Sequence, residues 1–170
     1  MRPGRPTALM IAGIVLLACG TVRADAQTRR VEQTDALFVV RLRAPLPEVL
    51  EALRAAVEQH NYVLGRTNDL DLALRQRAAA LGQRFDFERY KVLSYCNLTF
   101  ADEALRAEPA LGAFMPCRMA VYVTRGSQEV VIVTVRPTFL MRSFSAPEVG
   151  RLAAQVEADT LGILRMVAGE

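Results

Sequence analysis

The sequence of 170 residues has no tryptophan, a single histidine (His60) and three cysteines, and Lys91 is its only lysine. A single histidine excludes a metal centre built from several imidazole ligands. The chain also lacks the glycine-rich sequences that bind phosphates or dinucleotides, and it has no G-x-S-x-G sequence around a nucleophilic serine. The sequence therefore carries no signature of a familiar enzyme class.

The N-terminal segment, residues 1–26, has the pattern of a secretory signal. Arg2 and Arg5 precede an apolar run over residues 8–20, and Ala24-Asp25-Ala26 follows with the small-residue spacing of a cleavage site. The apolar run is shorter than the ~20 residues that a membrane-spanning helix needs. We therefore expect an exported domain, in the bacterial periplasm, without a membrane span in the mature chain.

Two other readings of this segment stay open. Leu16-Leu17-Ala18-Cys19 resembles a bacterial lipobox, in which Cys19 would carry a lipid and anchor the protein to a membrane. In the third reading the segment is an uncleaved anchor. All three readings export the domain.

The charge balance argues against a nucleic-acid partner. The formal net charge of the whole chain is +3, and removal of residues 1–26 leaves 18 basic and 17 acidic side chains. Nucleic-acid binding depends on an excess of basic side chains that neutralise phosphates. With 52% hydrophobic and 23% charged residues, the remaining chain is instead typical of one folded domain.

The pattern along the chain predicts a flexible leader over residues 27–35 and a single α+β domain over 36–170. Strands and helices do not alternate strictly, which favours a mainly antiparallel sheet of about five strands with helices on one face. Dimerisation through the uncovered face or an edge is then expected. The predicted strands are 36–43, 62–67, 87–96, 114–124 and 130–135, and the predicted helices are 48–60, 70–81, 100–107 and 147–167.

Cys96 and Cys117 are the only thiols outside the signal segment. An even pair in an oxidising compartment is a candidate disulfide if the two strands are neighbours. Two unpaired packing cysteines and a reactive or ligand-binding thiol site are the alternatives. Neither cysteine belongs to a C-x-x-C sequence, so the usual signature of thioredoxin chemistry is missing.

Sulfur side chains occur at every second residue in Met115-Pro116-Cys117-Arg118-Met119. On a strand they would project from one face, and two thioethers with a thiolate are soft donors suited to Cu(I). Plain packing is the competing interpretation, because methionine fills gaps in cores. Arg118 would alternate to the face opposite Cys117, where its charge could lower a thiol pKa, although such a side chain more often extends to solvent.

The remaining candidates for chemistry favour structural roles. His60 ends an amphipathic helix, where it is expected to pack or to interact with the C-terminal end of the helix dipole. Asp69, Asp71, Asp102 and Glu103 fall in predicted turns or helix starts, where they are expected to cap. An enzyme that uses His60 or these carboxylates is the third class of function.

Three blocks give the sequence its resemblance to the DUF302 domain family. They are Tyr90-Lys-Val-Leu-Ser-Tyr-Cys96-Asn97, Ala104-Leu105, and Phe114-Met-Pro116-Cys117-Arg118-Met-Ala-Val-Tyr122. Many members carry Phe-Gly-Asn-Pro at the first block and Leu-Pro without cysteine at the third, so this chain resembles a cysteine-bearing branch. The resemblance covers about residues 37–135 and implies a two-layer α+β sandwich and homodimers. It supplies no catalytic residue and no cofactor.

We therefore predict an exported, non-enzymatic domain that binds a small ligand or dimerises. Its candidate locus comprises Cys96, Asn97, Met115, Pro116, Cys117, Arg118 and Met119. The rival hypothesis assigns the same cysteines to thiol redox chemistry, the handling of sulfur compounds or Cu(I) binding.

Overall fold

The computed structural model describes residues 30–170, which form one antiparallel sheet with helices packed against it. The predicted α+β class is confirmed, with six strands where about five were expected. The strand order is β1-β2-β6-β5-β4-β3, and each neighbouring pair is antiparallel. The strands are β1 (Val31–Gln33), β2 (Leu37–Leu42), β3 (Val63–Asp69), β4 (Phe87–Cys96), β5 (Cys117–Thr124) and β6 (Val130–Val135). The helices are α1 (Leu46–Gln59), α2 (Leu70–Ala80), α3 (Leu98–Ala107), α4 (Pro137–Leu140) and α5 (Pro147–Ala168), with 3₁₀ turns η2 (Pro109–Phe114) and η3 (Met141–Ser143).

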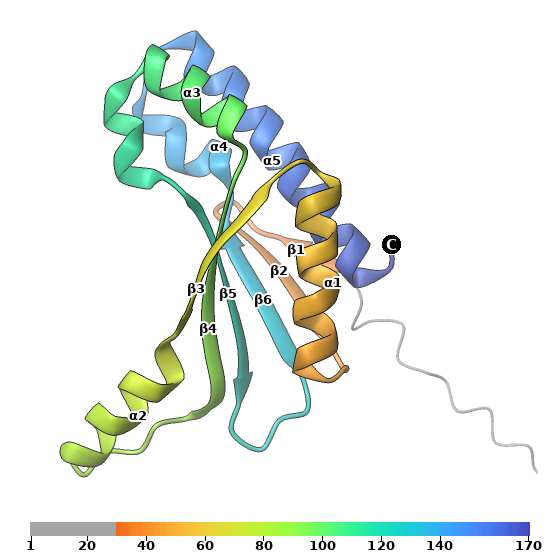
Figure 1. Ribbon diagram of the computed structural model, residues 1–170, viewed down its shortest axis with the longest axis vertical. Coiled ribbons are helices and arrows are strands. Elements are labelled where there is room, and N and C mark those ends of the chain that lie inside the picture. The colour runs from red at the N-terminus through yellow and green to blue at the C-terminus, as the bar shows by residue number, and fades with distance from the viewer. Residues whose placement is uncertain (1–29) are drawn as a thin grey trace, which may run out of the picture.

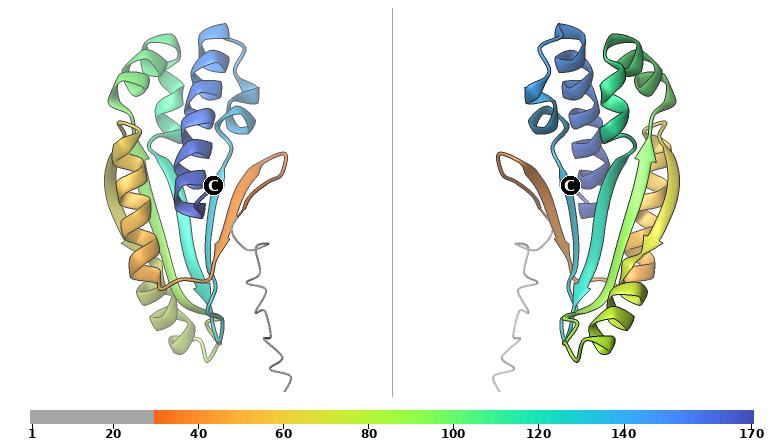
Figure 2. Two further views of the ribbon diagram at one scale, coloured as in Figure 1. Left: turned by 90° about the vertical axis from the view of Figure 1, so that its right-hand side faces the viewer. Right: turned by 90° about the vertical axis from the view of Figure 1, so that its left-hand side faces the viewer.

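The helices are distributed unevenly over the molecule. Figures 1 and 2 show α1 beside α5, with α3 and α4 gathered at one end of the sheet and α2 extending from the opposite end. The main core lies between the sheet and the α1–α5 pair, where Phe38, Leu53, Ile132 and Leu164 are fully buried. Because α5 has 22 residues and spans about 33 Å, it continues past this core to the α3 end.

Two local predictions were wrong. The predicted leader contains β1, an edge strand that pairs with β2 and whose Val31 amide donates to Glu170 near the C-terminus. The predicted strand 114–124 begins only at Cys117, because residues 109–114 form η2 and a cis Met115–Pro116 peptide bond follows. Proline cannot donate a ladder hydrogen bond, which explains why the strand starts after it.

The N-terminal predictions lie partly outside this structure. The signal segment 1–26 and Cys19 precede the described residues. Within residues 30–170, no helix has the length and apolar character required to cross a bilayer.

His60 has the packing role that its position suggested. Its ring lies between α1 and α5, where Nδ1 is 2.9 Å from the Ala56 carbonyl oxygen. A Cβ built on Gly162 of α5 would lie 2.6 Å from His60 Nε2. Gly162 therefore allows the close approach of the two helices.

We expect Gly162→Ala to lower the free energy of unfolding in the wild-type background and to raise it when His60 is also replaced by alanine. Alanine favours a helix interior over glycine by about 1 kcal/mol, but here its methyl group meets the imidazole. Gly150→Ala is the matched control, because a Cβ there meets nothing within 4 Å, and it should stabilise α5. Urea unfolding of the wild type, Gly162→Ala, His60→Ala, the double variant and Gly150→Ala measures these changes, and stabilisation by Gly162→Ala alone would contradict the packing role.

Candidate functional site

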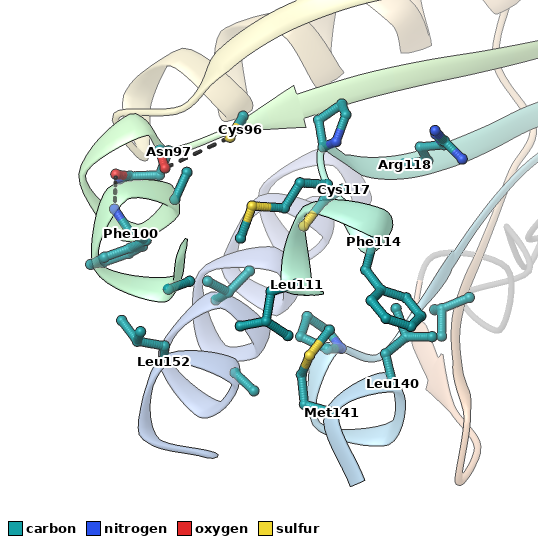
Figure 3. A pocket seen from close by; sticks show the side chains of 18 of the residues that line it. Cys96, Asn97, Phe100, Leu111, Phe114, Cys117, Arg118, Leu140, Met141 and Leu152 are labelled. Carbon is teal, nitrogen blue, oxygen red and sulfur yellow. Dashed lines mark hydrogen bonds between the residues drawn. The ribbon is translucent and has the colours of Figure 1, made fainter. Parts of the chain in front are cut away.

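A pocket of about 320 Å³ opens where β4 and β5 meet the helices at the α3 end of the sheet. It lies beside a second hydrophobic cluster, distinct from the main core, in which Ala104, Leu111, Val149 and Leu152 are buried. Figure 3 shows side chains from α3, η2, β5, α4 and α5 around this space. The size is within the usual range for pockets that take small molecules.

The N-terminal half of α5 forms one wall of the pocket. Val149, Leu152, Ala153 and Val156 line it, and they recur at the three- and four-residue steps of one helical face. The C-terminal half of the same face packs into the main core. One amphipathic helix thus covers both the core and the pocket.

A carboxylate on α5 fixes the opposite wall. Glu157 accepts from Arg136 Nε at 3.0 Å and Nη2 at 2.7 Å, and its other oxygen accepts from the Thr138 amide at 2.9 Å and from the Thr138 hydroxyl. Thr138 lies in the first turn of α4, whose Pro137 and Leu140 line the pocket, followed by Met141. Glu157 therefore holds α4 in place.

The hydroxyl and amide side chains of the lining are already bonded to the protein. Tyr62 donates to Asp159 at 3.0 Å, and the Thr134 hydroxyl donates to the Arg118 carbonyl at 2.8 Å. Asn97 caps α3: its oxygen accepts from the Thr99 and Phe100 amides, and its amide donates to the Asn61 carbonyl. The surface that remains available to a ligand is therefore mainly apolar.

Both cysteines border the pocket, and the structure shows them unpaired. Cys117 lies opposite Tyr95 in the β4–β5 ladder, whereas Cys96 is the residue after Tyr95. Successive side chains alternate between the faces of a strand, so the two thiols start on opposite faces. The two strands are neighbours, which meets the condition set for the candidate disulfide, but the cysteines are unpaired in this arrangement.

The thiols have raised pKa values. Burial is the main cause for Cys117, whose pKa rises to about 11, with a further increase from the neighbouring Cys96. Burial also raises the pKa of Cys96. The Arg118 guanidinium lowers neither pKa, and Figure 3 shows it pointing away from the cavity. Both groups are protonated thiols at neutral pH, which disfavours a nucleophilic site.

Of the sulfur side chains at residues 115, 117 and 119, only the first two reach the pocket. Met115 and Cys117 line it, together with Cys96, Asn97, Pro116 and Arg118 of the predicted locus. Met119 lies in the main core with 1% of its surface exposed. The alternation of sulfur atoms on one face thus holds for Cys117 and Met119, whereas Met115 precedes the strand. Within residues 30–170, no three His, Cys, Asp or Glu side chains are grouped to hold a metal ion.

Sequence reasoning missed most of the apolar walls. Leu111, Leu140 and Met141 come from η2, α4 and η3, which are short and have no clear periodicity of their own. Leu152 was assigned to a helix face but not to a cavity. The predicted capping role was also wrong for Asp102 and Glu103, which lie within α3 and pair with Arg106 and Arg151.

We expect Cys117 to react with iodoacetamide slowly at pH 7, with a rate that keeps rising with pH to about 11. The thiolate is the reactive species, and burial delays its formation. Cys96→Ser isolates the reaction of Cys117, and mass spectrometry counts the modified thiols. A reaction rate that levels off below pH 9 would contradict the raised pKa.

Comparison with known proteins identifies the family. The family model described as "Domain of unknown function DUF302" matches residues 38–167. The chain belongs to the DUF302 family. Its fold is similar to the crystal structure of an uncharacterised conserved DUF302 protein from Bacillus stearothermophilus, with a TM-score of 0.69 and 21% sequence identity. That match covers 78% of this chain and 98% of the other, and no curated protein matches.

Proposed function

We propose that this DUF302 domain binds a small, uncharged, mainly apolar molecule in the pocket beside α3 and α5. The observation that carries the proposal is the lining itself: apolar side chains surround the space, and the hydroxyl and amide groups among them are engaged within the protein. Arg118 is the one charged residue of the lining, and its guanidinium points away from the cavity, so a charged ligand would lose its hydration without gaining a partner inside it. The domain acts as a carrier or sensor and not as an enzyme.

The proposal includes the predicted export of the domain and its place in a cysteine-bearing branch of the family. The N-terminal segment supports periplasmic delivery, and Cys96 and Cys117 at the pocket edge support the branch. In this role the thiols contribute soft, polarisable surface to the lining.

Titration with the uncharged fluorophore N-phenyl-1-naphthylamine tests the proposal. We expect saturable binding with an increase in fluorescence, and weaker binding of an anionic naphthalene sulfonate of similar size. Equal binding of both probes, or no saturation, would contradict an apolar pocket.

Cu(I) binding is the second candidate, favoured by the presence of Cys96, Met115, Cys117 and Met141 around one space. Met119 cannot take part because it is buried in the core. Competition of the reduced protein with a chromophoric Cu(I) chelator tests this function. Transfer of one Cu(I) from the chelator to the wild type, with no transfer to Cys117→Ser, would support Cu(I) binding. Absence of transfer to the wild type would contradict it.

We also propose that the uncovered face of the sheet joins two copies of the domain. Val130 and Ile132 face the main core, and Val131 and Val133 alternate to the other face, so β6 is apolar on both sides. Strands with one solvated face usually alternate apolar and polar residues. Light scattering should give the mass of a dimer for the wild type and the mass of a monomer for Val133→Lys. A monomeric wild type would contradict the proposal.

A further inference from the structure

Helix α2 has an exposed apolar surface far from the pocket. Figure 1 shows it extending from the end of the sheet opposite to α3 and α4. Its only buried residue is Asp71, whereas Leu72, Leu74 and Leu81 are 59%, 45% and 50% exposed. Helices in proteins are usually stabilised by packing an apolar face, and α2 leaves most of its leucines without such contacts. We call residues 70–85 the α2 arm.

Arginines border a hollow beside the α2 arm. Arg75, Arg84 and Arg125 border a surface hollow of about 430 Å³ that also contains Phe85. Arg75 and Arg125 are held by backbone carbonyls: Arg75 donates to Glu88 at 2.9 Å and Arg125 to Phe85 at 2.9 Å. Neither forms an ion pair with a described carboxylate, so both keep their full positive charge.

The arm as a whole is basic, whereas the domain is nearly neutral. Residues 70–85 contain Arg75, Arg77, Arg84 and one carboxylate, Asp71, and Arg84 pairs with Asp86 just beyond the arm at 3.0 Å, so Arg75 and Arg77 carry the excess positive charge. Asp71 is buried and lies 3.5 Å from Arg89 of β4, so it does not neutralise the arm's outer surface. The exposed surface of the arm is therefore positively charged.

We propose that the α2 arm docks on the surface of an anionic lipid bilayer. The arginines would contact lipid phosphates while the leucines enter the boundary between head groups and acyl chains, as in interfacial segments that combine basic and apolar side chains. Successive helical residues are about 100° apart, which places Leu72 and Leu74 on different sides of α2. A bilayer accommodates apolar side chains on both sides of a protruding arm, whereas a protein groove receives a single stripe.

This proposal goes beyond ligand binding and can fail independently of it. The arm and helix α3, which contributes to the pocket lining, lie at opposite ends of the sheet, so docking of the arm would leave the pocket end of the sheet away from the bilayer. A ligand-binding defect and a docking defect are therefore measured on different variants.

Vesicle co-sedimentation of the chain from Gln27 onward, which contains every described helix and strand, tests the proposal. We expect binding to vesicles that contain phosphatidylglycerol, weak binding to vesicles of phosphatidylcholine alone, and a loss of affinity with added salt. Arg75→Gln with Arg77→Gln should weaken binding on the order of 30-fold, from about fivefold for each arginine. Leu72→Ser with Leu81→Ser should weaken it about tenfold or more.

Met166→Ser is the matched control, because Met166 is a 43% exposed apolar residue on α5, and this variant should bind as the wild type does. Absence of wild-type binding to anionic vesicles, or wild-type affinity in both double variants, would overturn the proposal. Binding to an immobilised acidic polypeptide in place of vesicles would also overturn it, since the partner would then be a protein.

Discussion

Replacing Glu157 by alanine is expected to lower the free energy of unfolding by about 3 kcal/mol, the loss typical of a buried ion pair with one partner removed. The Glu157 and Arg136 side chains are only 13% and 19% exposed. Arg136 would keep its hydrogen bonds to the Thr34 and Asp35 carbonyls but would lose its carboxylate. Urea unfolding measures the change, and Glu58→Ala, at an exposed site on α1, should change it little.

The same carboxylate should make stability depend on pH. Burial raises the pKa of Glu157, but hydrogen bonds from Arg136 and Thr138 and the charge of Arg136 outweigh it, so the pKa lies below its ordinary value. Its contribution is therefore present above the unfolded-state pKa, about 4.3, and is lost as the pH falls through the folded-state value. As the pH falls from 6 into the acid range, the free energy of unfolding should decrease less in Glu157→Gln than in the wild type. Equal decreases in the two proteins would contradict the role of the ion pair.

Replacing Ala153 by phenylalanine is expected to weaken binding of N-phenyl-1-naphthylamine by more than about 100-fold, equivalent to roughly 2.7 kcal/mol. Ala153 lines the pocket from α5 and is 6% exposed, so a phenyl group there would take the space of the ligand. Ala154→Phe is the matched control, because Ala154 is the next residue on the same helix and faces solvent. Unchanged affinity in a folded Ala153→Phe protein would place the probe elsewhere.

The elements with a strong periodic pattern were predictable from the sequence. Strand β4 coincides with the prediction 87–96, and α5 ends one residue beyond the predicted 147–167. In both elements, apolar residues are regularly spaced over ten or more positions, and this pattern outweighs the secondary-structure preferences of individual residues. That β4 and β5 are neighbours was only a condition set for the candidate disulfide, because the strand order was not predicted.

The pocket was only half predictable. Its edge at Cys96, Asn97 and Cys117 follows from strand ends and an unusual sequence, but its volume depends on η2 and α4. These elements contain six and four residues, too few for a periodic pattern, and α4 is positioned by Glu157 from a distant part of the chain. The prediction that the sulfur side chains of residues 115, 117 and 119 project from one strand face was wrong for Met115. Pro116 lies between Met115 and Cys117, and the strand begins only at Cys117.

The methyl signals of the protein during titration with N-phenyl-1-naphthylamine provide the most direct test of the apolar pocket. Carbon-13 labels on methionine and leucine methyl groups report on Met115, Met141, Leu111 and Leu152 in the lining, and on Met119 and Leu53 in the main core. The account predicts saturable shifts in the first group and little change in the second. Shifts confined to leucines of the α2 arm, with the lining unchanged, would contradict it.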